Sequence, residues 1–230
     1  MDRRIWRAVA AAGLALAATP VAAGEDPWTV EATAASEYIS KGAGRSDGQP
    51  HLALLVQRGL GGDAYVGAWT GSLRAPLGAD AESHLYFGWR PRAAGWTFDV
   101  RPTFKVLVNA RDAAQTELWE YRLEAARPIA GARFRLRVEH TPDGFGASRA
   151  STWTDAALSR RLGDSAWTVS GGVGRREQET GRDYTAWNLG VQRRLGETLS
   201  ADLRWVDTDE TAAGREYDGR LVFGLTAALR

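Results

Sequence analysis

Residues 133–140 read RFRLRVEH, with arginine at positions 133, 135 and 137 and an apolar residue at positions 134, 136 and 138. In a β-strand this spacing places the arginines on one face and the apolar side chains on the other. In a soluble protein the apolar face would form the core, whereas in an outer-membrane barrel it contacts lipid and the arginines line the interior. The fold therefore depends on which face points inward, and this stretch alone leaves both options open.

The first 23 residues have the features of a secretory signal peptide. Three arginines among the first seven residues form a basic start, an apolar run follows over residues 8–18, and Val21-Ala22-Ala23 offers small side chains at a cleavage point. The run is too short to cross a bilayer as a helix, which argues against a membrane anchor. We therefore predict a signal peptide over residues 1–23 and a single exported domain over residues 24–230.

The composition limits the class of protein. Cleavage removes three arginines and one aspartate from 29 basic and 28 acidic residues, so the mature chain is almost neutral and no charge excess favours nucleic acid. The chain contains no cysteine, so an exported fold has to be stable without disulfides. No later stretch approaches 18 uninterrupted apolar residues, which excludes a spanning helix. A secreted or periplasmic β-protein and an outer-membrane barrel remain.

Twelve segments of alternating polarity follow one another along the mature chain, each about 9 to 12 residues long. An even number of strands of this length suits tilted strands that cross a hydrocarbon layer of about 25 Å. Nine of the ten tryptophans remain after the signal peptide and, with six tyrosines and six phenylalanines, add residues that favour strands and membrane interfaces. The predicted strands are 28–40, 50–59, 63–73, 82–91, 95–107, 116–127, 131–141, 151–162, 165–176, 183–194, 197–207 and 218–229.

The connections between these segments fall into two kinds. Five are short and place glycine or alanine after basic residues, as in RGLGGD and RRLGET, and they alternate with longer or more polar ones such as KGAGRSDGQP and DTDETAAGREYD. Short turns at one end and longer loops at the other are typical of an outer-membrane barrel, whereas a soluble sandwich does not need to sort them. The sequence therefore predicts an all-β fold, a single antiparallel up-and-down transmembrane β-barrel of twelve strands.

Charged residues gather on the strand faces that this register turns inward. One interpretation is a polar pore with a slight preference for anions where the arginines cluster. The alternative is that acids and arginines pair across strands and fill the lumen, and the sequence leaves both open. The residues predicted to line the pore are Asp99, Arg101, Lys105, Glu120, Arg122, Glu124, Arg133, Arg135, Arg137, Glu139, Asp202 and Arg204.

Several segments, in order along the mature chain, resemble the TorF family of proteobacterial porins. They are Ser36-Glu37-Tyr38 with Lys41-Gly42 and Ser46-Asp47, then Tyr65-Val66-Gly67-Ala68-Trp69, Leu85-Tyr86-Phe87-Gly88-Trp89, Asp183 to Val191, and Val206-Asp207-Thr208-Asp209. The resemblance implies an outer-membrane barrel described as a channel. One feature departs from the usual pattern: such barrels generally finish with an aromatic residue that the assembly machinery reads, whereas this chain ends Ala228-Leu229-Arg230.

Candidate catalytic and metal-binding residues are sparse. Ser83 is next to His84 and Thr141 is next to His140, so in a strand each hydroxyl points to the opposite face from its histidine. His51 is expected in a loop. KGAGRS has two of the glycines of a phosphate-binding loop but no helix follows, so we interpret it as a flexible external loop. The acids of DTDE near position 209 lack the glycine and the terminal glutamate of a calcium loop. We predict no enzyme activity, no metal site and no cofactor.

The expected function is passive transport of small polar solutes across a bacterial outer membrane. Its expected partners are outer-membrane lipid, the solutes themselves and the barrel-assembly machinery, with no nucleic acid. Two alternatives remain: a closed-lumen barrel with a structural or surface-binding role, and a soluble periplasmic or secreted β-protein.

Overall fold

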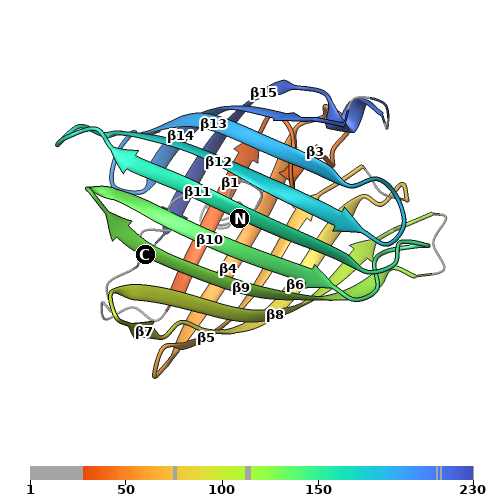
Figure 1. Ribbon diagram of the computed structural model, residues 1–230, viewed down its shortest axis with the longest axis horizontal. Helices are drawn as coiled ribbons and strands as arrows, with labels where there is room; N and C mark the ends of the chain where they lie inside the picture. The colour runs from red at the N-terminus through yellow and green to blue at the C-terminus, as the bar shows by residue number, and fades with distance from the viewer. Residues whose placement is uncertain (1–27, 75–76, 112–114, 211, 213, 230) are drawn as a thin grey trace, which may run out of the picture.

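The computed structural model describes residues 28–74, 77–111, 115–210, 212 and 214–229, and the predicted signal peptide lies outside this part of the chain. Over these residues the chain forms a closed antiparallel barrel of twelve long strands (Figure 1). Each strand pairs with its neighbours in sequence, and β1 pairs with β15, which closes the barrel. The predicted fold class is confirmed. The long strands are β1 (Trp28–Ala35), β4 (His51–Gly61), β5 (Ala64–Ser72), β6 (Ala81–Trp89), β8 (Trp96–Val108), β9 (Glu117–Ile129), β10 (Ala132–Thr141), β11 (Ser151–Arg161), β12 (Trp167–Gln178), β13 (Tyr184–Arg194), β14 (Leu199–Thr208) and β15 (Arg220–Leu229).

The remaining elements are short. β7 (Arg92–Ala93) pairs with the start of β8, and the 3₁₀-helix η1 (Arg215–Tyr217) precedes β15. The strands β2 (Ile39–Ser40) and β3 (Ala43–Gly44) form a small hairpin of their own. No helix among the described residues is long and apolar enough to cross a membrane.

The first strand is shorter than predicted. β1 ends at Ala35, not at residue 40, and the last bond of this segment to the barrel wall is donated by the Ser36 amide to the Phe223 carbonyl at 2.8 Å. Beyond that point the backbone leaves the wall and turns at Lys41 and Gly42, whose φ angles of 53° and 83° lie in the left-handed region. The predicted strand from 28 to 40 is therefore wrong after Ala35.

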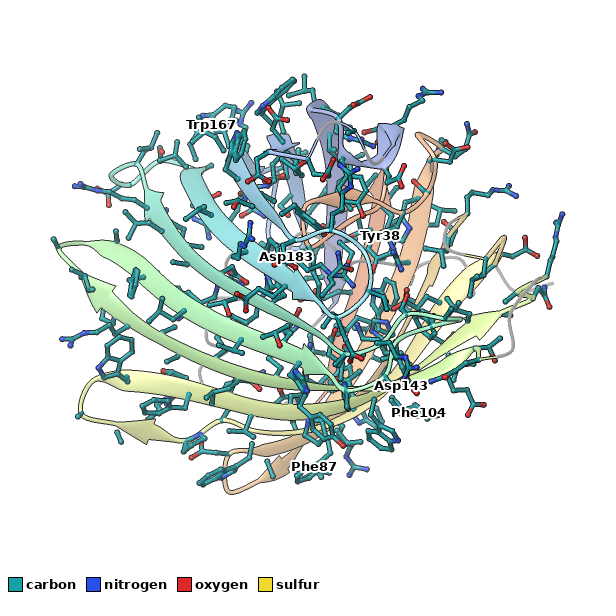
Figure 2. All side chains as sticks on the ribbon, turned by 45° about the vertical axis from the view of Figure 1, so that its right-hand side comes forward. Tyr38, Phe87, Phe104, Asp143, Trp167 and Asp183 are labelled. Carbon is teal, nitrogen blue, oxygen red and sulfur yellow. The ribbon has the colours of Figure 1, made fainter. Side chains whose placement is uncertain are left out.

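Alternate residues of each strand face inside and outside. In β10 the Leu136 side chain is 44% exposed, whereas Glu139 is only 4% exposed. Phe87 and Phe104 point away from the barrel, as Figure 2 shows. The apolar face of the RFRLRVEH strand is thus the outer face, and its arginines face the lumen, which answers the question that the sequence left open.

Aromatic side chains form a belt near each rim of the barrel. The belt at the rim that carries the turns includes Trp28, Trp89, Trp96 and Trp167, and the belt toward the loop rim includes Phe104, Trp119, Trp187, Trp205 and Phe223. At the turn rim, outward arginines stack on three of these tryptophans: Arg58 over Trp28 at 5.3 Å, Arg127 over Trp96 at 5.2 Å and Arg193 over Trp167 at 5.1 Å. Two aromatic belts on either side of an apolar band are typical of a barrel that sits in a bilayer.

The connections are sorted between the two rims as predicted, with one exception. The turns Gly62-Asp63 and Ala130-Gly131 have positive φ at both central residues, the conformation that matches the twist of a two-residue hairpin. Longer connections, including 36–50, 142–150 and 209–219, leave from the opposite rim. The connection 179–183 at that rim is short, because the β12–β13 ladder extends to Arg176 and Tyr184.

Candidate functional site: the barrel interior

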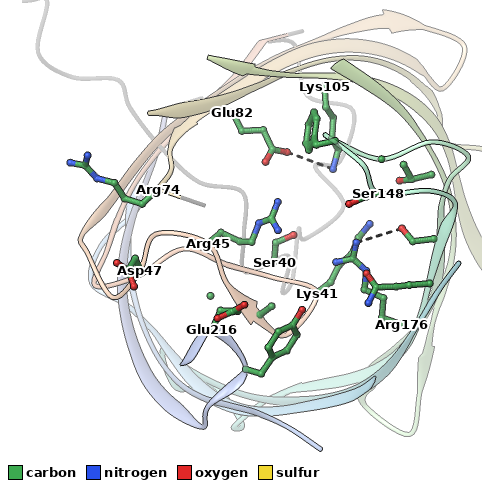
Figure 3. A pocket seen from close by; sticks show the side chains of 18 of the residues that line it. Ser40, Lys41, Arg45, Asp47, Arg74, Glu82, Lys105, Ser148, Arg176 and Glu216 are labelled. Atoms are coloured by element: carbon green, nitrogen blue, oxygen red, sulfur yellow. Dashed lines mark hydrogen bonds and ion pairs between the residues drawn. The ribbon is translucent and has the colours of Figure 1, made fainter. Parts of the chain in front are cut away.

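A cavity of about 740 Å³ opens at the loop rim of the barrel (Figure 3). Its lining comes from distant parts of the chain, including Arg45 from the first loop, Glu120 from β9, Arg176 from β12 and Tyr217 from η1. Charged and hydroxyl side chains dominate this lining. We call this cavity the vestibule.

Residues 36–50, which we call the inner loop, fold into the barrel and form one side of the vestibule. The Lys41 ammonium crosses to the opposite wall, where Nζ lies 2.5 Å from Oε2 of Glu120 and 3.6 Å from Oε2 of Glu139. The Tyr184 hydroxyl donates a hydrogen bond to the Lys41 carbonyl at 2.8 Å. The prediction that KGAGRS is a flexible external loop is wrong, because buried ion pairs and hydrogen bonds hold it inside.

Aromatic and aliphatic packing also anchors the inner loop. The Tyr38 ring stacks on His51 with centroids 4.5 Å apart and lies 5.7 Å from the Trp69 ring. Ile39 packs with Val206 of β14 and Val222 of β15. Burial raises the pKa of the Tyr38 phenol, so this buried side chain stays neutral.

The inner loop divides the interior. Lys41 borders the vestibule and also a second cavity of about 80 Å³, which lies among Arg135, Trp153, Asn188 and Arg204. Burial lowers the pKa of Lys41, while the carboxylates of Glu120 and Glu139 act in the opposite direction. A loop lysine that two wall carboxylates hold therefore lies at the border of both cavities.

A ladder of ion pairs runs along β9, β10 and β11. The Arg122 guanidinium contacts Glu139, with Nη2 2.5 Å from Oε1. Asp155 accepts from both Arg135 at 2.5 Å and Arg137 at 2.7 Å. These side chains come from neighbouring strands whose register places them on one face. Charge-assisted bonds of this kind are strong and fix the geometry of the wall.

Arg204 forms the centre of a second cluster on β12, β13 and β14. Its side chain is 1% exposed and donates to Asn188 Oδ1 at 2.7 Å, Ser170 Oγ at 2.9 Å and Asp202 Oδ2 at 3.1 Å. Gly190 is its partner in register, and a Cβ there would collide with the guanidinium group. Glycine on the inner face thus provides space for an arginine.

A third cluster lies toward the turn rim. The Tyr65 hydroxyl donates to Asp99 Oδ1 at 2.6 Å, and Arg90 binds Asp99 Oδ2 at 2.8 Å. Arg101 stacks over the Tyr86 ring at 4.7 Å. Aromatic rings therefore share this part of the lumen with charges.

The structure places the twelve side chains predicted to line the pore on the inner face of the wall. Of these, Lys105 and Glu120 border the vestibule and Arg135, Arg137 and Arg204 border the smaller cavity. Their role in transport stays a prediction. Those that form ion pairs are Asp99, Lys105, Glu120, Arg122, Glu124, Arg135, Arg137, Glu139, Asp202 and Arg204, whereas Arg101 and Arg133 form none within the described part of the chain.

Sequence reasoning missed the inner-loop residues of the site. Lys41 and Arg45 were assigned to an external loop, although this connection is the longest in the barrel and contains the apolar residues Tyr38 and Ile39. Apolar residues in a long connection indicate that the connection is buried, because transfer of apolar side chains out of water lowers the free energy.

Neither His51 nor His84 forms a catalytic arrangement with a neighbouring hydroxyl. His51 is the first residue of β4 and is buried, so its assignment to a loop is wrong. Its Nδ1 lies 2.8 Å from the Ser72 carbonyl and 3.4 Å from Ser72 Oγ. A nitrogen that donates to a carbonyl cannot take a proton from a hydroxyl. His84 Nε2 lies 2.6 Å from Glu82 and Ser83 points to the other face.

No group of three or more potential metal ligands occurs among the described residues. The carboxylates at the end of β14 and in the loop after it accept hydrogen bonds from nearby backbone amides instead. Asp209 Oδ1 accepts from the Thr185 amide at 2.7 Å, and Asp207 Oδ1 accepts from the Thr208 amide at 2.9 Å.

A closed twelve-stranded barrel with an apolar exterior, aromatic belts and a charged interior is the architecture of outer-membrane β-barrel proteins. The structure is similar to that of the KdgM porin, with a TM-score of 0.61 and 4% identity over 88% of this chain and 99% of that one. It is also similar to the NanC porin, with a TM-score of 0.59 and 8% identity over 88% of this chain and 99% of that one. A third similar structure is the COG4313 outer-membrane channel from Pseudomonas putida F1, with a TM-score of 0.58 and 10% identity over 93% of this chain and 100% of that one. At these identities the likeness is one of fold.

The chain belongs to the bacterial family Gcw_chp, described as bacterial proteins of unknown function, whose model matches residues 21–223. No curated protein matches it in sequence. This family match does not confirm the resemblance to the TorF porins, which stays a prediction.

Proposed function

We propose that this protein is an outer-membrane channel for small polar solutes, in which the inner loop forms the narrow point of the passage. The observation that carries the proposal is the vestibule of about 740 Å³ that opens inside a closed barrel and shares Lys41 as a border with a second cavity. The apolar exterior and the aromatic belts support a place in the outer membrane. The predicted signal peptide and the TorF resemblance agree with this proposal.

The charges of the lumen favour anions. Glu37, Glu82, Asp99, Glu120, Glu124, Glu139, Asp155 and Asp202 each form an ion pair. Glu31 on the inner face and Asp47 in the inner loop form no ion pair within the described part of the chain. Several bases have no such partner, so positive charge is left over. Within the described part of the chain, the bases on the inner face or inner loop that form no ion pair are Arg45, Arg101, Arg133, Arg161, Arg176 and Arg194.

The test is the conductance of purified protein in planar lipid bilayers. Correct folding is first established by the heat-dependent mobility of the barrel on gels. We expect discrete conductance steps, and larger steps from a variant in which residues 38–48 are replaced by a short glycine linker. Folded protein that gives no steps in either form would overturn the proposal.

The ion-pair ladders also support a second candidate function, that of a closed barrel with a structural or surface-binding role. Buried pairs such as Arg135–Asp155 and Lys41–Glu120 fill lumen space and hold the inner loop in place. In that case the loop-replacement variant stays as silent as the natural protein.

A further inference from the structure

We propose that Arg45 and Arg176 form a binding site in the vestibule for an oxyanion, a carboxylate or phosphate group carried by a small solute. This inference deepens the proposed channel function by naming the chemistry of its entrance. It begins from two guanidinium groups that face the same cavity without a carboxylate partner.

Three of the six acids that line the vestibule, Glu37, Glu82 and Glu120, form ion pairs with other bases. Glu120 binds both Lys41 at 2.5 Å and Lys105 at 2.9 Å, and Glu37 binds Arg220 at 2.7 Å. Neither Arg45 nor Arg176 forms an ion pair within the described residues. The remaining lining acids, Asp47, Glu216 and Asp218, come from the inner loop and the last loop.

Both arginines carry a buried Nε atom that has no hydrogen-bond partner among the described residues. The closest polar contact of Arg176 is a long one, from Nη2 to Ser151 Oγ at 3.5 Å. Because these Nε atoms are buried, the terminal amino groups of the two guanidinium groups are the donors that a solute in the cavity can reach. The planar guanidinium matches the two oxygens of a carboxylate or phosphate.

The backbone of Arg45 is held by two hydrogen bonds, while its side chain forms no hydrogen bond or ion pair with the described residues. Its amide donates to the Tyr38 carbonyl at 2.7 Å, and its own carbonyl accepts from the Arg74 amide at 3.0 Å. Figure 3 shows the side chain near the centre of the barrel opening, with Arg74 at the outer edge. Such an arrangement is preorganised, because little backbone order has to be gained on binding.

Arg176 lies on the opposite wall, in β12, between Trp153 and Tyr184 in register. The charges of Arg176 and Arg45 both act on the Tyr217 phenol. Burial and Tyr184 raise the pKa of Tyr217, whereas Arg176 and Arg45 lower it. The cavity volume of about 740 Å³ falls in the range of small-molecule sites, about 300–1,000 Å³. The two guanidinium groups therefore converge on space large enough for a solute.

The experiment measures binding in detergent micelles, which does not require conduction. The folded protein is titrated with inorganic phosphate, followed by phosphorus NMR line width, and with citrate, followed by proton line width. We expect binding of at least one probe, and the active probe identifies phosphate or carboxylate as the preferred group. Arg45→Gln and Arg176→Gln should each weaken it about tenfold, the loss expected for a charge-assisted hydrogen bond.

Arg74→Gln is the matched control, because it removes an equal charge from the exposed rim of the same cavity. It should leave binding within about twofold of the natural protein. The proposal is overturned if the natural protein binds neither probe, or if all three variants lose affinity equally. A protein that binds but does not conduct would overturn the channel function alone, so the two failures are distinguishable.

Discussion

The ammonium of Lys41 lies 2.5 Å from Glu120 Oε2, so a loop residue is ion-paired to a strand on the opposite wall of the barrel. Glu120 keeps a second cation in Lys105 at 2.9 Å, and Glu139 keeps Arg122. Removing Lys41 therefore leaves no wall carboxylate without a partner. The loop alone loses its anchor.

From this relationship we expect Lys41→Met to free the inner loop while the barrel stays folded. Trypsin should then cleave after Arg45, which mass spectrometry of the digest detects, and the conductance steps should grow. Lys105→Met is the control, since it removes a cation from the same Glu120 without touching the loop. Equal cleavage in both variants would show that the ion pair does not hold the loop.

The close approach of Gly190 to Arg204 predicts a strict size limit. Gly190→Val would push against the buried guanidinium and should destabilise the barrel by about 1–3 kcal/mol, the usual cost of overpacking. The measurement is urea unfolding in micelles followed by tryptophan fluorescence. Gly196→Ala, at a turn position with no atom within 4 Å of the added Cβ, should leave the midpoint unchanged. Similar shifts in both variants would contradict this account.

The unpaired Arg133 should contribute to the ion selectivity of the channel. Removing its inward charge in Arg133→Gln should lower the permeability ratio of chloride to potassium, read from the reversal potential in a salt gradient. Arg193→Gln near the same rim is the comparison, because that side chain faces outward and stacks on Trp167. An unchanged ratio in Arg133→Gln would place the selectivity elsewhere.

The outward arginines at the turn rim predict a dependence on anionic lipid. A triple change of Arg58, Arg127 and Arg193 to Gln should reduce folding into phosphatidylglycerol vesicles, with about 1 kcal/mol lost per arginine. Folding into neutral phosphatidylcholine vesicles should change less. Arg175→Gln, at the loop rim and paired with Asp183, serves as the control. Equal losses in both lipids would point to the cation–π contacts alone.

The wall of the barrel was predictable because its signals are local. The two-residue period of RFRLRVEH, the even number of segments and the positive-φ turns at Gly62 and Gly131 all act over a few residues. The same period placed Arg204 and Gly190 on one inner face, where the structure packs them together. A strand offers only two faces, so a correct register assigns most side chains at once.

The sequence by itself thus determined a twelve-stranded barrel and the side of the wall on which each charge lies. The tertiary structure decided two features that the alternation could not. It set which acid forms an ion pair with which arginine, and it turned residues 36–50 into the barrel. The partners of Lys41 are 79 and 98 residues away in sequence, at Glu120 and Glu139. Contacts across a closed lumen depend on curvature and depth, which no local pattern encodes. That is why the loop predicted to be external lies inside the barrel.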